Sequence, residues 1–256
     1  MKFESILYEA SDGIATITIN VPHKLNALTL EAYGELGRAF KEADGDGEVR
    51  AIILTGVGER AFCAGDDIGV WTDISLVDTR NFLKEAMAVL MAIEKTEKPS
   101  VAAVNGHALG SGCELCLACD VVIASEKAAF GLPEPKLGMS PGYAILRLPD
   151  VIGERRARRM LLTGESIGAQ QAWEFGLAHT VVPPGDLMAA AIEEAGRLKA
   201  VAPLSSALIK STLNRKGGGE DVAYITEMAT LLLVTEDARE GSRAFIERRA
   251  PKFQGK

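Results

Sequence analysis

The sequence predicts an α/β fold, because strand and helix patterns alternate along its first half. Residues 13–20 (GIATITIN) alternate apolar and polar side chains as a strand does, and residues 28–44 (LTLEAYGELGRAFKEAD) have the apolar spacing of a helix. Residues 49–56 (VRAIILTG) form an apolar run ending in glycine, which is typical of a buried strand. The alternation continues with a long helix, a short strand, a second helix and another strand at 75–97, 100–106, 112–118 and 120–125.

The second half of the chain is mainly helical. Helical patterns follow Gly142 in RRARRMLLTG, GAQQAWEFG and LMAAAIEEAGRLKAVAP, and Pro203 marks a hinge after them. We therefore divide the chain into a core at 1–200 and a C-terminal helical region at 201–256. The apolar face of that region is too large to leave in water. It should pack on the core, on a second copy of the chain, or on both.

The composition predicts a soluble, cytoplasmic protein. The 256 residues are 47% hydrophobic and 25% charged, which suits one domain or one domain with an appendage. No apolar run approaches the roughly 18 residues that span a bilayer, and the start MKFESILYEASDG lacks a leader pattern. The net charge of −7 disfavours nucleic acid and membrane partners. The basic run ERRARR (154–159) is interpreted as a solvated helix face, with a local site for an anionic cofactor as the alternative.

Three cysteines, Cys113, Cys116 and Cys119, repeat every third residue, and Cys63 lies far upstream. Such spacing could serve a redox motif or an iron–sulfur cluster, but a cluster needs a loop that wraps around the metal. The run GCELCLAC instead has the pattern of a buried helix, where free cysteine acts as a small hydrophobic residue. We therefore expect these thiols to pack, and we expect no metal site.

Two carboxylates lie beside tight turns between Val104 and Gly142. Glu114 follows the glycines Gly106, Gly110 and Gly112, and Glu134 lies in the proline-rich FGLPEPKLG. Glycine permits close backbone approach to a ligand, and a helix beginning near Gly112 would leave N–H groups free to meet negative charge. This pattern indicates acid/base chemistry next to a polarised oxygen.

Five ordered motifs carry a resemblance over nearly the whole chain. They are PHKLNAL (22–28), AFCAGDDI (61–68), NGHALGSGCELCLACD (105–120), FGLPEPKLG (130–138) and AFIERRAPKF (244–253). Together they are similar to motifs of the enoyl-CoA hydratase/isomerase (crotonase) superfamily, closest to its two-glutamate hydratases. The resemblance implies a ClpP-like spiral of repeated ββα units, with a C-terminal helical region that builds trimers, often paired into hexamers. It also implies an acyl-CoA thioester as substrate, without a metal or redox cofactor.

The resemblance also assigns roles in the reaction, which is syn addition of water to a 2-enoyl-CoA. The backbone N–H groups of Asp66 and Ser111, rather than their side chains, would bind the thioester oxygen and stabilise enolate-like charge. Glu114 and Glu134 match the two catalytic glutamates and would hold a water between them. Glu114 would accept its proton and Glu134 would deliver one to the α-carbon, while the N–H of Gly142 helps to hold the water.

Other residues would surround the ligand. By the resemblance, the groove for CoA and substrate contains Lys24, Leu25, Leu28, Ala64, Asp67, Ile68 and Gly110. Phe245 and either Arg248 or Lys252 would reach the CoA of a neighbouring subunit. Trp71 and Tyr143 are candidates to shape the acyl pocket, and His107 is a candidate for the thioester channel. The alternatives are core packing for the aromatic side chains and His107, and exposed turn positions for His23 and Lys24.

Several alternatives remain open from the sequence. Ser111 replaces a usual glycine and could be a nucleophile, provided that a histidine lies within hydrogen-bond reach. An isomerase could work with one carboxylate, and a non-catalytic or RNA-binding scaffold could use neither. Glu114 could merely cap a helix while Glu134 occupies a surface turn.

The chain departs from the hydratase pattern after the second glutamate. Residues 141–148 read PGYAILRL where the family usually has a longer, glycine-rich PGxGGTQRL, and Pro135 follows Glu134 directly. Proline removes one N–H and fixes φ. We expect Tyr143 and Ile145 to fill space beside the water, which favours a shaped or cyclic acyl group over an ordinary fatty one.

Overall fold

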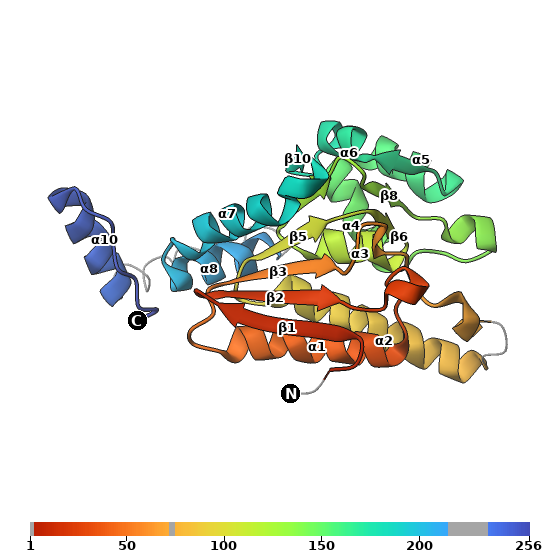
Figure 1. Cartoon of the computed structure of the whole chain (residues 1–256), viewed down its shortest axis with the longest axis horizontal. Helices are drawn as coiled ribbons and strands as arrows, with labels where there is room; N and C mark the ends of the chain where they lie inside the picture. Colours follow the sequence, from red (N-terminus) through yellow and green to blue (C-terminus); the bar gives the residue numbers. More distant parts are fainter. Residues whose placement is uncertain (1–2, 72–74, 215–234) are drawn as a thin grey trace, which may run out of the picture.

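The computed structural model describes residues 3–71, 75–214 and 235–256. Its larger sheet has six strands in the order β1-β2-β3-β5-β7-β10 (Figure 1). Every neighbouring pair is parallel except β1 and β2, which form an antiparallel hairpin. The strands are β1 (Ile6–Ser11), β2 (Ile14–Ile19), β3 (Ala51–Gly56), β5 (Ser100–Val104), β7 (Val121–Ser125) and β10 (Thr180–Val182).

A second sheet contains four strands of three residues each, in the order β4-β6-β8-β9. They are β4 (Ala61–Cys63), β6 (His107–Leu109), β8 (Ala129–Gly131) and β9 (Ser166–Gly168). The chain passes from the large sheet to the small one three times, through β3–β4, β5–β6 and β7–β8, and a helix follows each passage. This arrangement is the predicted spiral of ββα turns.

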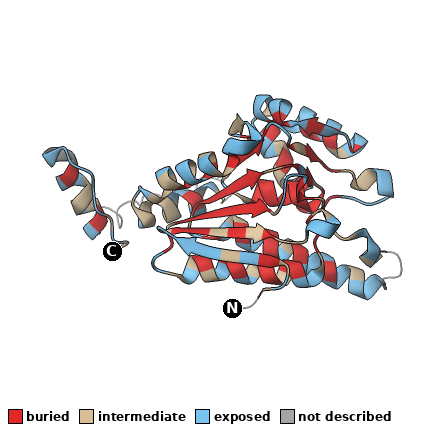
Figure 2. Ribbon diagram, in the orientation of Figure 1, coloured by how far each residue is buried: buried red, intermediate tan, exposed pale blue. Residues whose placement is uncertain are grey.

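Helices cover both faces of the large sheet. Alternate residues of each strand point to opposite faces, so Ile52 and Leu54 join one apolar cluster while Ala51 and Ile53 join another. The first cluster lies against α1 (Leu30–Gly45), α2 (Leu76–Lys95) and α3 (Ser111–Ala118), and the second lies against α7 (Leu187–Lys199). Figure 2 accordingly shows the central strands as buried. Two-sided burial explains why β3 is continuously apolar.

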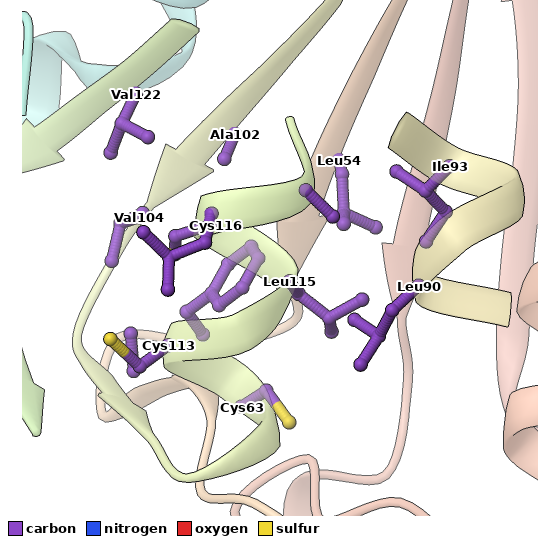
Figure 3. Close-up of a cluster of buried hydrophobic side chains, with 14 of the residues drawn as sticks. Leu54, Cys63, Leu90, Ile93, Ala102, Val104, Cys113, Leu115, Cys116 and Val122 are labelled. Carbon is purple, nitrogen blue, oxygen red and sulfur yellow. The ribbon is translucent and has the colours of Figure 1, made fainter. Parts of the chain in front are cut away.

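Helix α3 is buried along its whole length, as its apolar sequence predicts. Cys113 and Cys116 lie in the core with Leu54, Leu90 and neighbouring apolar side chains (Figure 3). The thiols therefore pack as small hydrophobic groups. No cluster of potential metal ligands is found among the described residues.

The remaining helices lie at the periphery. They are α4 (Tyr143–Ile152), α5 (Glu154–Thr163), α6 (Ala169–Phe175), α8 (Pro203–Leu213) and α10 (Glu236–Glu247), with short 3-10 turns η1 (Pro22–Lys24), η2 (Ile68–Trp71), η3 (Glu134–Leu137) and η4 (Pro184–Asp186). The arginines of α5 are exposed while Ala157 and Met160 face the core, as expected of a solvated helix face. No described helix is long and apolar enough to cross a bilayer.

The C-terminal region contacts the core at a few polar positions. Lys210 of α8 is buried and forms an ion pair of 2.7 Å with Asp120. Helix α10 lies apart from the rest of the described chain (Figure 1). The tail after α10 returns to the core, where Arg50 donates hydrogen bonds to the carbonyls of Phe253 and Val201. The division of the chain at residue 200 stays a prediction.

Candidate active site

Two glycine-rich turns meet where β4 and β6 end. A Cβ atom on Gly112 would lie 2.1 Å from the carbonyl oxygen of Cys63, so only glycine permits this approach. Gly65 and Gly110 have φ of +103° and +52°, and a Cβ on Gly110 would lie 3.7 Å from the Cα of Gly65. The segments before Asp66 and Ser111 therefore lie backbone to backbone, although they are 45 residues apart.

The N–H groups of Asp66 and Ser111 remain available at this junction. The neighbouring groups pair regularly, since Leu28 N–H donates to the Gly65 carbonyl and Asp67 N–H donates to the Leu28 carbonyl. Within the described residues, neither the Asp66 nor the Ser111 N–H has an acceptor. Ser111 is the first residue of α3, where backbone N–H groups have no partner inside the helix. Two free donors next to each other can bind an oxygen that carries partial negative charge.

Glu114 is a buried carboxylate on the first turn of α3, with 6% of its surface exposed. Its Oε1 accepts a hydrogen bond of 2.9 Å from the N–H of Ala144 in α4. Burial raises the pKa of Glu114 to about 7; the Ala144 hydrogen bond opposes this rise, while the charges of Glu134 and Asp66 add to it. Such a carboxyl group can exchange a proton near neutral pH.

Glu134 begins η3 and is half-buried. Its Oε1 lies 3.0 Å from the position of a Cβ on Gly110, which brings the carboxylate to the junction of the two turns. Its Oε2 is buried, and no described residue donates a hydrogen bond to it. Burial raises the pKa of Glu134, its own backbone N–H opposes the rise, and the charge of Asp66 adds to it. Pro135 fits because the second position of the 3-10 turn needs no N–H donor.

The side chain of Asp66 brings a third carboxylate to the junction, which the sequence analysis missed. Its Oδ1 accepts hydrogen bonds from the hydroxyl groups of Tyr33, at 2.8 Å, and Ser111, at 2.7 Å. Burial raises the pKa of Asp66, and these hydrogen bonds from Ser111 and Tyr33 oppose the rise. No local pattern links residue 33 with residues 66 and 111, so the sequence held no signal for this contact.

Two motifs of the predicted CoA groove come together as neighbouring segments. Leu28 bridges to Asp66, and Ala64 N–H donates to the Leu25 carbonyl at 3.1 Å. Lys24 forms an ion pair with Asp67, and its hydrogen bond lowers the pKa of that carboxyl group. Ile68 is 60% exposed at the edge of this groove.

Asn26 is a second residue that the sequence analysis missed. It is buried in left-handed backbone with φ of +59°. Its side chain accepts from Val21 N–H at 3.0 Å and donates to the Ala61 carbonyl at 2.8 Å. Asn26 therefore fastens the turn that carries Lys24 and Leu25 to β4. Asn26 lies inside the motif PHKLNAL, and this position was the sequence signal that could have identified it.

Helix α4 occupies the wall where the sequence departs from the family pattern. Gly142 is its N-cap, and the N–H group of Ala144 donates to Glu114. That the N–H group of Gly142 holds the water stays a prediction. Tyr143 is buried beside Glu94 of α2 and Arg147, whereas Ile145 is 47% exposed. Ile145 thus points largely to solvent instead of filling the wall, and the expected place of Tyr143 beside the water stays a prediction.

Some candidates lie elsewhere. Arg248 and Lys252 are exposed and follow α10, a helix that lies apart from α3 in Figure 1. The side chains of Trp71 and Phe245 lie outside the described part of the structure.

The alternative role of Ser111 as a nucleophile requires a histidine within hydrogen-bond reach. The three histidines His23, His107 and His179 are all exposed, and the Ser111 hydroxyl donates to Asp66. The geometry therefore offers no histidine to activate Ser111 as a nucleophile.

Comparison with known proteins agrees with this geometry. The family model for enoyl-CoA hydratase/isomerase matches residues 9–256. The chain therefore belongs to the enoyl-CoA hydratase/isomerase family. It is 38% identical to the short-chain-enoyl-CoA hydratase of Clostridium acetobutylicum, over 100% of this chain and 98% of that protein. It is 36% identical to the crotonyl-CoA hydratase of Syntrophomonas wolfei, over 100% of both chains.

A solved structure confirms the predicted crotonase fold. The enoyl-CoA hydratase from Bacillus anthracis superposes with a TM-score of 0.95 at 33% identity, covering 99% of this chain and 100% of that one. The match extends over the whole spiral and its C-terminal helices, so the fold inferred from five short motifs is correct.

Proposed function

We propose that this protein is an enoyl-CoA hydratase, which reversibly adds water in the syn sense to a 2-enoyl-CoA and gives a 3-hydroxyacyl-CoA. The observation that carries the proposal is the meeting of a buried carboxylate, Glu114, and a half-buried one, Glu134, with two free backbone N–H groups. Family membership and hydratases as full-length relatives support it.

The thioester oxygen is proposed to accept hydrogen bonds from the N–H groups of Asp66 and Ser111. When water attacks C3, the electrons of the double bond move toward the carbonyl and the oxygen gains negative charge. Donors already aimed at this oxygen stabilise the transition state more than the ground state, and one such donor contributes roughly 3–4 kcal/mol.

The glutamates are proposed to divide the proton transfers. Ionised Glu114 takes a proton from the attacking water, whose oxygen bonds to C3, and protonated Glu134 gives its proton to C2. After product release, Glu114 loses its proton to solvent and Glu134 regains one, which restores both groups for the next turnover. The Ala144 N–H supports the ionised form of Glu114. The unpartnered Oε2 of Glu134 suits a protonated acid whose hydrogen faces the substrate. Both steps are proton transfers, so the reaction needs no cofactor besides the CoA of its substrate.

Substitution of each glutamate tests the assignment. Glu114→Gln and Glu134→Gln should each lower crotonyl-CoA turnover by at least roughly 100-fold, measured by loss of the enoyl absorbance. Binding of a CoA ester, measured by calorimetry, should stay within about threefold, because neither side chain belongs to the CoA groove. Undiminished turnover in either variant would contradict the hydratase assignment.

An isomerase is the main alternative, because one carboxylate can shuttle a proton between two carbons. It predicts that Glu114→Gln keeps exchange of the α-proton with solvent and that product from ¹⁸O-labelled water carries no label. The hydratase incorporates the label into its 3-hydroxyl group. A non-catalytic or RNA-binding scaffold would instead show no measurable affinity for acyl-CoA.

The exposed apolar side chains of the C-terminal region bear on how the protein assembles. We propose that residues 201–256 build a homotrimer, which can pair into a hexamer, and that Phe245 and Lys252 then meet the CoA of a neighbouring subunit. The separation of α10 from the core and the exposure of Leu213 and Ile209 support this role. Light scattering on the full chain measures the state, and a monomer at micromolar concentration would contradict it. The cytoplasmic location expected from the sequence stays a proposal.

A further inference from the structure

The two residues whose N–H groups form the proposed oxyanion site also bond through their side chains. The Ser111 hydroxyl donates to Oδ1 of Asp66 at 2.7 Å, so the loop after β4 is joined to the first residue of α3. The same oxygen accepts the Tyr33 hydroxyl at 2.8 Å. We call Tyr33, Asp66 and Ser111 the donor clamp.

Tyr33 connects the donor clamp to the rigid core. Its side chain is 1% exposed on α1, and its ring meets Phe82 of α2 edge to face, at 5.8 Å between centroids and 89° between planes. Burial raises the pKa of Tyr33 well above its usual range, so the hydroxyl keeps its proton and acts as a donor. A buried aromatic residue with few accessible rotamers is a firm anchor for a loop.

We infer that Asp66 is a positioning residue, whose side chain holds the N–H groups of Asp66 and Ser111 at the separation needed to bind one thioester oxygen. This inference rests on the proposed function and deepens it. The physical reason is that the pairing of β4 with β6 ends at Cys63 and Ala108, and the two donors follow on glycine-rich segments whose backbone can adopt many conformations. A fixed donor pair stabilises the enolate without reorganising during the reaction.

The charge of Asp66 allows a positioning role to be distinguished from an acid/base role. Its neighbours are Tyr33 from α1, Cys63 from β4, Ser111 from α3 and the carboxyl groups of Glu114 and Glu134; no cation is among them. A negative charge here opposes a developing enolate. Asparagine keeps an oxygen that accepts both hydroxyl bonds but carries no charge. Positioning therefore predicts that Asp66→Asn retains turnover, whereas an acid/base role for Asp66 predicts its loss.

The test uses the full-length protein with Asp66→Asn, Asp66→Ala, Ser111→Ala and the double alanine variant. Asp66→Ala and Ser111→Ala should each lower kcat for crotonyl-CoA roughly 10-fold, less than the loss of a whole donor, with KM within about twofold. The double variant should be no slower than the worse single variant, because each single substitution already breaks the hydrogen bond between Ser111 and Asp66. Asp66→Asn should stay within about threefold of the parent.

A spectroscopic measurement reports on the donors without turnover. A 4-dimethylaminocinnamoyl thioester of CoA absorbs at longer wavelength when its carbonyl oxygen is polarised. The parent and Asp66→Asn should shift this absorbance to the red on binding, and Ser111→Ala should shift it less. If the parent fails to hydrate crotonyl-CoA but shows the shift, the proposed function fails and the donor clamp stands.

Ser100 offers a matched control, because it forms another serine–aspartate hydrogen bond, of 2.9 Å to Asp120, where β5 begins. Ser100→Ala should change the melting temperature and leave kcat and the red shift unaltered. Three results would each overturn the inference: a Ser111→Ala variant with the parent's kcat and red shift, independent effects in the double variant, or an Asp66→Asn variant as slow as Asp66→Ala.

Discussion

The N–H group of Ala144 donates to Oε1 of Glu114 at 2.9 Å, so the proposed base is held by the segment in which this chain departs from its family pattern. Within this segment, Gly142 is the N-cap of α4 and residues 143–148 form the first part of the helix. A helix N-terminus presents unpaired N–H groups and favours negative charge. The altered sequence thus keeps a donor for the carboxylate, while Tyr143 is buried beside Glu94 and Arg147.

The first prediction concerns the pH dependence of turnover. Glu114 must be ionised to accept a proton, and its pKa is raised to about 7. The value of kcat/KM should therefore fall about tenfold per pH unit below about pH 7, measured with crotonyl-CoA at constant ionic strength. A loss of activity above that pH instead would make Glu114 the acid and reverse the two proposed roles.

The second prediction concerns stability. The folded-state pKa of Glu114 lies above its ordinary value of 4.5. The raised pKa therefore adds a favourable term to the free energy of unfolding that is fully present below pH 4.5 and is lost as the pH rises through about 7. Glu114→Gln, which can still accept the Ala144 hydrogen bond, should raise the unfolding free energy by roughly 3 kcal/mol at pH 8 and by less than roughly 1 kcal/mol at pH 5. Urea denaturation measures both, with exposed Glu9→Gln as the control. An equal effect at both pH values would contradict the role of charge.

The third prediction concerns the close approach of α3 to β4. Gly112→Ala would place Cβ 2.1 Å from the Cys63 carbonyl oxygen and should cost more than about 3 kcal/mol of stability. Gly45→Ala, at the end of α1, has no atom within 4 Å of the new methyl group and should be neutral or stabilising. Thermal denaturation compares them, and similar melting temperatures would show that α3 can move.

The fourth prediction concerns the link between α8 and the core. Asp120→Asn leaves the buried ammonium group of Lys210 without a counter-charge and should destabilise the protein by roughly 3 kcal/mol. Arg197→Met breaks an exposed ion pair with Glu193 and should cost less than about 1 kcal/mol. If both variants unfold at the same urea concentration, α8 is not held by this pair.

The regular elements could largely be predicted from the sequence. The helix expected at 28–44 is α1, where the Thr29 hydroxyl accepts a hydrogen bond from Ala32 N–H, and the expected strand at 49–56 contains β3. The four strands of the small sheet were not predicted as strands, because three residues are too short to show an alternating pattern. Helix α4 was also missed, since Pro149 interrupts its pattern.

The sequence by itself determined which residues could do the chemistry. Glu114, Glu134 and the glycine-rich turns were identified from local motifs, since each motif is continuous in the chain. Only the tertiary structure decided how they are held. The hydrogen bonds of Ala144 to Glu114, and of Tyr33 and Ser111 to Asp66, join residues 30 to 45 positions apart. Such contacts depend on how helices pack against the sheets, and no periodic pattern along the chain encodes them.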